Sequence, residues 1–219
     1  MKKALFITTN IIAIALIIFG GIGYLSNLIQ AINYDNIGHN KYYEQKPLND
    51  QQGFAVDSSG NIYMGTMEFS GIQVYDGNGK FLYGMSFPTG WGGYFDYFID
   101  DKELLHVLLH RSLQEYTIFN GEVVGKTDNI NLEERTGIFE SKKSNSISRP
   151  NGLTYIKSSR KTIDIIENSE FIKQVKLDTP IWPLSVTTFF MINAFGFLML
   201  ALLHRRLFKL KGYKKMNGK

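Results

Sequence analysis

Two long apolar segments lie near the ends of the chain and enclose a middle region of mixed polarity. Residues 4–25 and residues 181–203 contain no Asp, Glu, Lys or Arg. An α-helix rises about 1.5 Å per residue, so each segment is long enough to cross the hydrocarbon core of a bilayer, roughly 30 Å thick. A helix also satisfies the backbone N–H and C=O groups within the segment. The pattern predicts two transmembrane helices rather than buried helices of a soluble protein.

Charge is distributed as is typical of a membrane protein. All Asp and Glu residues lie between Asp35 and Asp178, whereas the short N-terminus, residues 1–3, and the tail, residues 204–219, carry only basic charge. Basic residues beside a span stay in the cytoplasm. We therefore expect both termini inside and residues 34–179 outside, with the lipid bilayer as a partner and no role for nucleic acid. The absence of Cys and of Asn-x-Ser/Thr sites, with this simple topology, favours a bacterial plasma membrane.

The first apolar segment could be a cleaved signal peptide or an uncleaved signal anchor. It has the basic start of a signal peptide, but its apolar run is long for that role. The small residues near its end, Gly21-Ile22-Gly23 and Ile29-Gln30-Ala31, match an Ala-x-Ala cleavage site poorly. A signal anchor is the favoured interpretation.

The middle region alternates short apolar runs with turn signals, which is the pattern of antiparallel strands. Asp57-Ser58-Ser59-Gly60-Asn61 and Asp76-Gly77-Asn78-Gly79 are turn sequences rich in small polar residues and Gly. Four apolar runs surround them: Phe54–Val56, Ile62–Gly65, Ile72–Tyr75 and Lys80–Tyr83. This order predicts one four-stranded antiparallel sheet.

The segment from Gly53 to Phe81 resembles one blade of the NHL-repeat β-propellers. The resemblance rests on an apolar strand, the Asp57-Ser58-Ser59-Gly60-Asn61 turn, and Ile72-Gln73-Val74-Tyr75-Asp76 followed by Gly79-Lys80-Phe81. It covers about a seventh of the chain and implies a blade. It implies little about activity, because propellers serve many functions.

The same arrangement of strands and turns recurs more weakly along the chain. Second-hairpin turns fall at Asp76, Asn120 and Asn168, about 45 residues apart, which suits propeller repeats. We therefore predict an all-β domain of small or open propeller-like blades, with an antiparallel β-sandwich as the alternative. Residues 34–50 are expected to form a stalk or an edge strand, or part of a fourth blade.

Few motifs in the sequence indicate catalysis. His106 and His110 have the spacing of zinc-binding histidines on a helix, but Val107 stands where such enzymes carry Glu. The more ordinary interpretation is two histidines on one face of a strand. No nucleophile elbow, Walker sequence or dinucleotide fingerprint is present. We expect no enzyme activity, no metal and no cofactor.

An aromatic, Gly-rich connection follows the best-defined blade. Its residues Trp91, Tyr94, Phe95 and Tyr97 are the candidate recognition surface, because aromatic side chains are common interface anchors. The alternative is that these rings fill the core between blades.

Two amides lie within the apolar segments. Asn10 and Asn193 are candidates for packing the helices together by hydrogen bonds. The leading hypothesis is a membrane-anchored binding or scaffold module that holds a protein or envelope component outside, with homo-oligomerisation possible. The alternatives are an accessory subunit of a larger membrane complex, such as a transporter or secretion apparatus, and an extracytoplasmic hydrolase or lyase.

Overall fold

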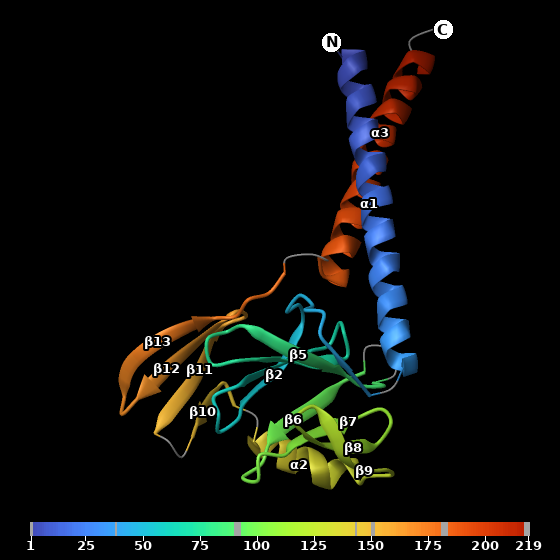
Figure 1. The fold of residues 1–219 in the computed structure, drawn as a ribbon. Coiled ribbons are helices and arrows are strands. Elements are labelled where there is room, and N and C mark those ends of the chain that lie inside the picture. Colours follow the sequence, from blue (N-terminus) through green and yellow to red (C-terminus); the bar gives the residue numbers. More distant parts are fainter. Residues whose placement is uncertain are drawn as a thin grey trace. The chain divides into compact units, whose positions relative to one another are not determined.

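The chain folds into two compact units. One unit contains Met1–Leu28 and Leu184–Lys219, and the other contains Ile29–Pro183. The computed structural model describes residues 2–37, 39–89, 93–142, 144–149, 152–180 and 184–216 (Figure 1).

The first unit is a pair of helices, formed by α3 (Val186–Met216) and by the part of α1 (Lys2–Ile37) that ends at Leu28. Each contains a window, Phe6–Ile29 in α1 and Val186–Leu203 in α3, that is long and apolar enough to cross a membrane. Only 17% and 11% of these windows are buried, so neither helix is enclosed as in the core of a soluble protein. Helix α1 continues beyond the predicted span to Ile37, and the predicted stalk therefore begins inside a helix.

The two helices run antiparallel and approach closely at glycines. The Asn27 amide donates a hydrogen bond to the carbonyl oxygen of Leu184 at 2.9 Å. A Cβ on Gly20 would lie 2.7 Å from the backbone N of Asn193, and one on Gly196 would lie 2.7 Å from the Ile17 side chain. Only glycine allows this approach, which is typical of packed transmembrane helices.

The second unit contains three antiparallel sheets and one helix. Sheet A has the order β1-β5-β4-β3-β2, sheet B the order β6-β7-β8-β9, and sheet C the order β10-β11-β12-β13. Apart from β1, consecutive strands pair in each sheet, as in a propeller blade. The strands are β1 (Asn40–Tyr42), β2 (Gln51–Val56), β3 (Ile62–Thr66), β4 (Gly71–Tyr75), β5 (Phe81–Ser86), β6 (Phe95–Ile99), β7 (Leu105–Leu109), β8 (Gln114–Phe119), β9 (Glu122–Thr127), β10 (Ser146–Ser148), β11 (Leu153–Ser159), β12 (Thr162–Glu167) and β13 (Glu170–Lys176), and helix α2 is Leu132–Lys142.

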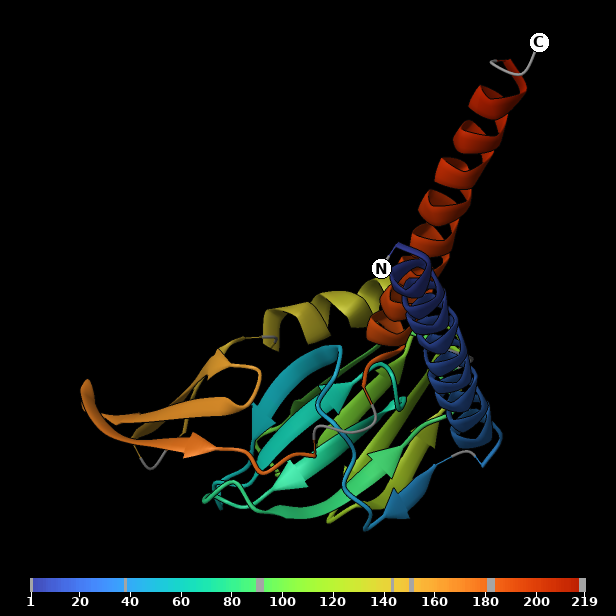
Figure 2. The same ribbon diagram turned by 90° about the horizontal axis from the view of Figure 1, so that it is seen from above.

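Sheet A is the middle layer of the β domain (Figures 1 and 2). One of its faces packs on sheet B through residues that include Ile72, Phe87 and Val107. The other face packs on sheet C through residues that include Met64 and Ile163. Strands β3 and β4 are buried along their whole length because both faces are covered. Chain order alone would place sheet B in the middle, as the second of three blades.

The strand and turn assignments made from the sequence agree with these sheets. The predicted hairpin turns are present. The turn of the last hairpin begins at Asn120 in sheet B and at Asn168 in sheet C, and both residues have positive φ. Residues 40–42 add β1 to the outer edge of sheet A, beside β5. They therefore supply an edge strand and not a fourth blade.

Helix α2 was not predicted from the sequence. Asn131 caps its N-terminus: the side-chain Oδ1 accepts from the Glu134 N–H at 3.5 Å, and the carbonyl oxygen accepts the helical bond from the Arg135 N–H at 3.1 Å. The sequence Asn131-Leu132-Glu133-Glu134 has the acidic first turn that favours a helix start. The helix buries Phe139, whose ring packs edge-on against Phe98 of β6 at 4.8 Å between centroids.

Candidate functional site

The predicted aromatic surface is largely part of the core. Trp91 lies outside the described residues. Phe95 is fully buried and Tyr97 is 7% exposed, so these two rings do not lie on a surface; they occupy the space between sheets, the alternative raised from the sequence. Tyr94 is 43% exposed, and its ring meets His110 edge-on.

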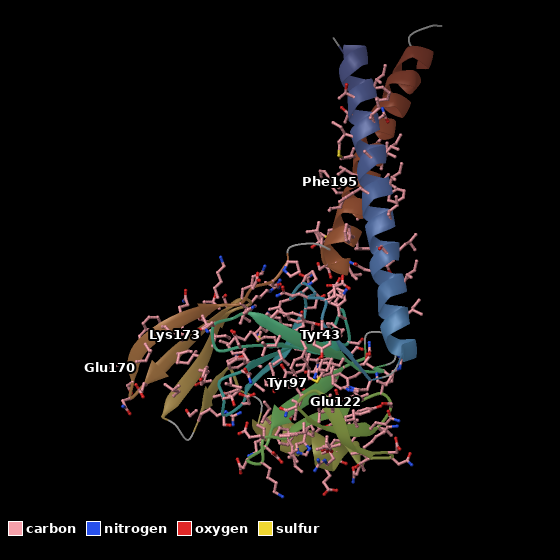
Figure 3. All side chains as sticks on the ribbon, in the orientation of Figure 1. Tyr43, Tyr97, Glu122, Glu170, Lys173 and Phe195 are labelled. Atoms are coloured by element: carbon pink, nitrogen blue, oxygen red, sulfur yellow. The ribbon has the colours of Figure 1, made fainter. Side chains whose placement is uncertain are left out.

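Tyr97 joins sheet B to sheet A within the β domain (Figure 3). Its hydroxyl accepts a hydrogen bond from the Gly65 N–H at 2.7 Å and donates to the Tyr63 carbonyl at 3.1 Å. A Cβ on Gly65 would lie 2.7 Å from the Tyr97 ring. Tyr97 therefore holds two sheets together.

The two candidate amides of the helix pair have different partners. Asn193 donates a hydrogen bond from Nδ2 to the carbonyl oxygen of Ile17 at 2.8 Å, across the two helices. Asn10 donates instead to the carbonyl oxygen of Phe6, one turn earlier in its own helix, at 2.9 Å. Asn193 thus connects α1 and α3, whereas this bond of Asn10 is local.

A pocket of about 210 Å³ opens where turns from sheets A and B meet. The β2–β3 turn supplies Asp57 and Ser58, the β6–β7 turn supplies Glu103, and the β8–β9 turn supplies Asn120. Tyr63 lines the wall. The lining combines carboxylates, amides, hydroxyls and an aromatic ring, which is the composition of a small polar binding site.

Two of the three turns at the pocket share one backbone geometry. In the β2–β3 turn, the Gly60 N–H bonds the Asp57 carbonyl at 3.1 Å, and in the β6–β7 turn the Glu103 N–H bonds the Asp100 carbonyl at 3.1 Å. Both fourth residues have positive φ, +81° for Gly60 and +63° for Glu103. Glycine takes this conformation freely, whereas Glu103 is strained there.

Glu103 bridges the two sheets at the pocket. Its Oε2 accepts a hydrogen bond from the backbone N–H of Ser58 at 2.8 Å. The equivalent turns at Gly79 and Gly152 also have glycine with positive φ. The sequence reasoning missed Glu103; the available signal was a charged side chain where the repeat carries glycine.

The lining of the pocket contains two carboxylates, Asp57 and Glu103, and no basic side chain. The nearest ammonium described is that of Lys41, whose Nζ donates to the Asn120 carbonyl at 2.9 Å. Asp57 accepts from the Asn61 N–H and the Asn61 side-chain amide, both at 2.8 Å, and from the Tyr63 hydroxyl at 3.3 Å. No basic side chain of the described residues forms a salt bridge with Asp57 or Glu103. Burial raises the pKa of Tyr63, and the neighbouring Tyr83 and Asp57 raise it further, so its hydroxyl remains a neutral donor.

The two histidines of β7 share the outer face of sheet B, as the strand period predicts. His106 contacts Glu115 Oε1 at 2.9 Å and Asp100 Oδ2 at 3.2 Å, while His110 contacts Asp96 Oδ2 at 2.9 Å. Each histidine thus has its own acidic partners. Among the described residues, no group of three side chains is arranged to hold a metal.

An ionic network ties helix α2 to this face. The Arg135 guanidinium donates to both carboxylate oxygens of Glu115, from Nε to Oε2 at 2.8 Å and from an Nη to Oε1. Hydrogen bonds to Glu115 and Asp100 raise the pKa of His106 against the opposing effect of burial. Burial opposes the charge of Glu115, but bonds from His106 and Arg135 hold its pKa below the usual value. The network is structural because it fastens a helix to a sheet.

Comparisons with known proteins identify no family. No protein-family model and no curated protein matches the chain. Solved structures similar to it include a protein of unknown function from Bacteroides caccae, with 17% identity, 58% of this chain and 46% of that chain covered, and a TM-score of 0.30. Virginiamycin B lyase from Staphylococcus aureus has 13% identity, 64% and 46% coverage and a TM-score of 0.34. A streptogramin B lyase has 10% identity, 65% and 46% coverage and a TM-score of 0.32. The chain spans about half the length of these proteins, and at these values the likeness assigns no activity.

Proposed function

We propose that the protein is a membrane-anchored binding module whose β domain lies outside the cell and holds a positively charged group of a protein or envelope component. The observation that carries this proposal is the pocket at Asp57 and Glu103, which has net negative charge and an opening to solvent. A pair of carboxylates that forms no salt bridge attracts an ammonium or guanidinium group.

The surface of the helix pair supports the anchoring. Apolar side chains are exposed around both helices, for example Ile11 at 62%, Ile22 at 65% and Phe195 at 56% (Figure 3). An apolar surface of this extent is unfavourable in water and favourable in lipid. Because α1 and α3 are antiparallel, two membrane crossings would put both chain ends on one side, and the basic charge of both tails favours the cytoplasm as that side.

The polar chemistry of the β domain supports binding rather than catalysis. Both histidines of β7 bond carboxylates, and no described hydroxyl donates to either of them. A nucleophile activated by a histidine requires such a contact. The proposed function includes no catalytic step and no cofactor.

The pocket can be tested in intact cells that express the full chain. A photo-crosslinking amino acid at Ser58 should capture a discrete protein or envelope component, and the same group at Ser158 of sheet C should not. Glu103→Gln keeps the acceptor for the Ser58 N–H and removes the charge, so we expect at least a five-fold loss of adduct with unchanged protein level, roughly one kcal/mol or more of binding. An adduct that is insensitive to Glu103→Gln, or equal from both positions, would contradict the proposal.

A further inference from the structure

The three glycines near the end of the first span have different surroundings. Gly20 and Gly23 are required for the packing of α1 on α3, because a Cβ on Gly20 would meet the Asn193 backbone and one on Gly23 would overlap the Phe189 ring. A Cβ on Gly21 would meet only Asn193 Nδ2, at an ordinary 3.4 Å. Glycine inside a helix costs about 0.5–1 kcal/mol relative to alanine. The packing of α1 on α3 does not explain that cost at Gly21.

Gly21 instead forms part of a groove on the surface of the helix pair. The groove has a volume of about 300 Å³ and is lined by Gly21, Tyr24, Leu25, Phe190 and Asn193. Small residues at such a surface let a further helix approach closely.

Two polar atoms of the groove have no partner within the described part of the chain. Asn193 uses Nδ2 for its bond to Ile17, and its Oδ1 accepts no hydrogen bond. The Tyr24 hydroxyl likewise makes no hydrogen bond there. Asn193 lies well inside the apolar window Val186–Leu203, where lipid offers no donor and an unsatisfied polar group is costly.

The donor and the acceptor lie at a similar level along the helix pair. Asn193 is level with Gly20, one turn before Tyr24. Side chains of a helix lean toward its N-terminus, so Tyr24 reaches back toward the level of Gly20 and Gly21. Asn193 leans the opposite way along the pair, because α3 is antiparallel to α1, and both side chains line the same groove.

We propose that this groove is a homodimer interface within the membrane, occupied by the same groove of a second copy. A two-fold axis along the helix pair places Tyr24 Oη of each copy against Asn193 Oδ1 of the other, so both unpartnered atoms are satisfied twice. Gly21 allows the approach. The interface rests on the proposed membrane anchoring, but it is independent of the pocket in the β domain.

The test is energy transfer between full-length chains reconstituted in liposomes. The chain has no Cys, so Ser59→Cys carries a single donor or acceptor dye. Wild-type chains should show transfer that falls with lipid dilution, as for a reversible dimer. Tyr24→Phe removes only the hydroxyls, and at about three-fold per interhelical hydrogen bond the two symmetric bonds predict roughly ten-fold weaker association.

Gly21→Ile should abolish the dimer, because its side chain fills the groove, while its Cβ lies at an ordinary 3.4 Å from Asn193 Nδ2 of α3. Ala15→Ile is the control, since it adds bulk at an exposed position of α1 outside the groove and should dimerise as wild type. Unchanged thermal unfolding in detergent would show that Gly21→Ile remains folded.

Flotation with the liposomes separates the two proposals. Chains that fail to float would refute the membrane anchoring. Floating chains that are monomeric, or that dimerise equally after Gly21→Ile or Tyr24→Phe, would refute the dimer and leave the groove to lipid or to another protein.

Discussion

His106 is the point where charged groups from three elements of the β domain meet. It contacts Asp100 after β6 and Glu115 of β8, and Glu115 in turn holds Arg135 of helix α2. The folded state raises the pKa of His106, so its charged form stabilises the fold below the unfolded-state value near 6.5. That contribution is lost as the pH rises through the folded-state pKa.

The acidic partners of His106 set the lower limit of the pH range in which this network stabilises the fold. The pKa of Glu115 and that of Asp100 are both lowered by their hydrogen bonds, although burial acts in the opposite direction. Their contribution is therefore present above their unfolded-state values near 4 and lost in stronger acid. Together these directions place the greatest stabilisation by the network between about pH 5 and 6.5.

His106→Gln should remove the loss of stability that occurs as the pH rises through the pKa of His106. We expect the wild type to lose about 1.5–3 kcal/mol of unfolding free energy between pH 5.5 and pH 8 from this residue, the range for a hydrogen bond to a charged group, and the variant to lose much less. Thermal unfolding of the full chain at the two pH values measures the difference. An unchanged pH dependence in His106→Gln would refute the assignment.

Individual site residues were predictable where strand alternation decides their position. The shared face of His106 and His110 follows from a period of two. Their partners do not, because Asp100, Glu115 and Arg135 come from elements whose pairing depends on the tertiary fold. The same limit applies to Phe95 and Tyr97, whose burial follows from the stacking of sheet B on sheet A.

At the scale of elements, the β4–β5 turn contains two glycines, Gly77 and Gly79, that look alike in the sequence but differ in backbone conformation and surroundings. Gly79 has a φ of +85°, and a Cβ there would overlap the carbonyl oxygen of Lys176. Gly77 is not in the positive-φ region, and a Cβ on it would meet only the Gly60 carbonyl at 3.5 Å.

Gly79→Val should therefore destabilise the β domain by at least about 1–3 kcal/mol from backbone strain, with a further cost from the overlap. Gly77→Val is the matched control and should cost well under 1 kcal/mol. Chemical unfolding of both variants beside the wild type measures this. Equal losses from the two substitutions would show that the turn geometry is not as described.

Elements with local signals were predictable, and elements that depend on distant partners were not. The hairpin turns at Asp57, Asp76 and Asn120 carry their own conformational preferences. Strand β1 is only three residues long and forms because β5 offers an open edge. Helix α2 has a low apolar content, and Phe139 and Arg135 stabilise it by contacts with sheet B.

At the scale of the whole molecule, the segregation of apolar and charged residues determines the architecture more clearly than it determines the ligand. The two apolar helices and the β domain between them follow from patterns that extend over tens of residues. The pocket forms only because turns from two sheets meet, and the placement of sheet A between sheets B and C is not encoded in any local motif.

The central claim is that the β domain is anchored outside the membrane by a helical hairpin. Single cysteines at Ser59, in the pocket turn, and at Gly218, in the basic tail, can be exposed to an impermeant thiol reagent in intact cells. The account predicts labelling of Ser59→Cys at once and labelling of Gly218→Cys only after the membrane is opened. Labelling of Gly218→Cys in intact cells, or protection of Ser59→Cys, would contradict it.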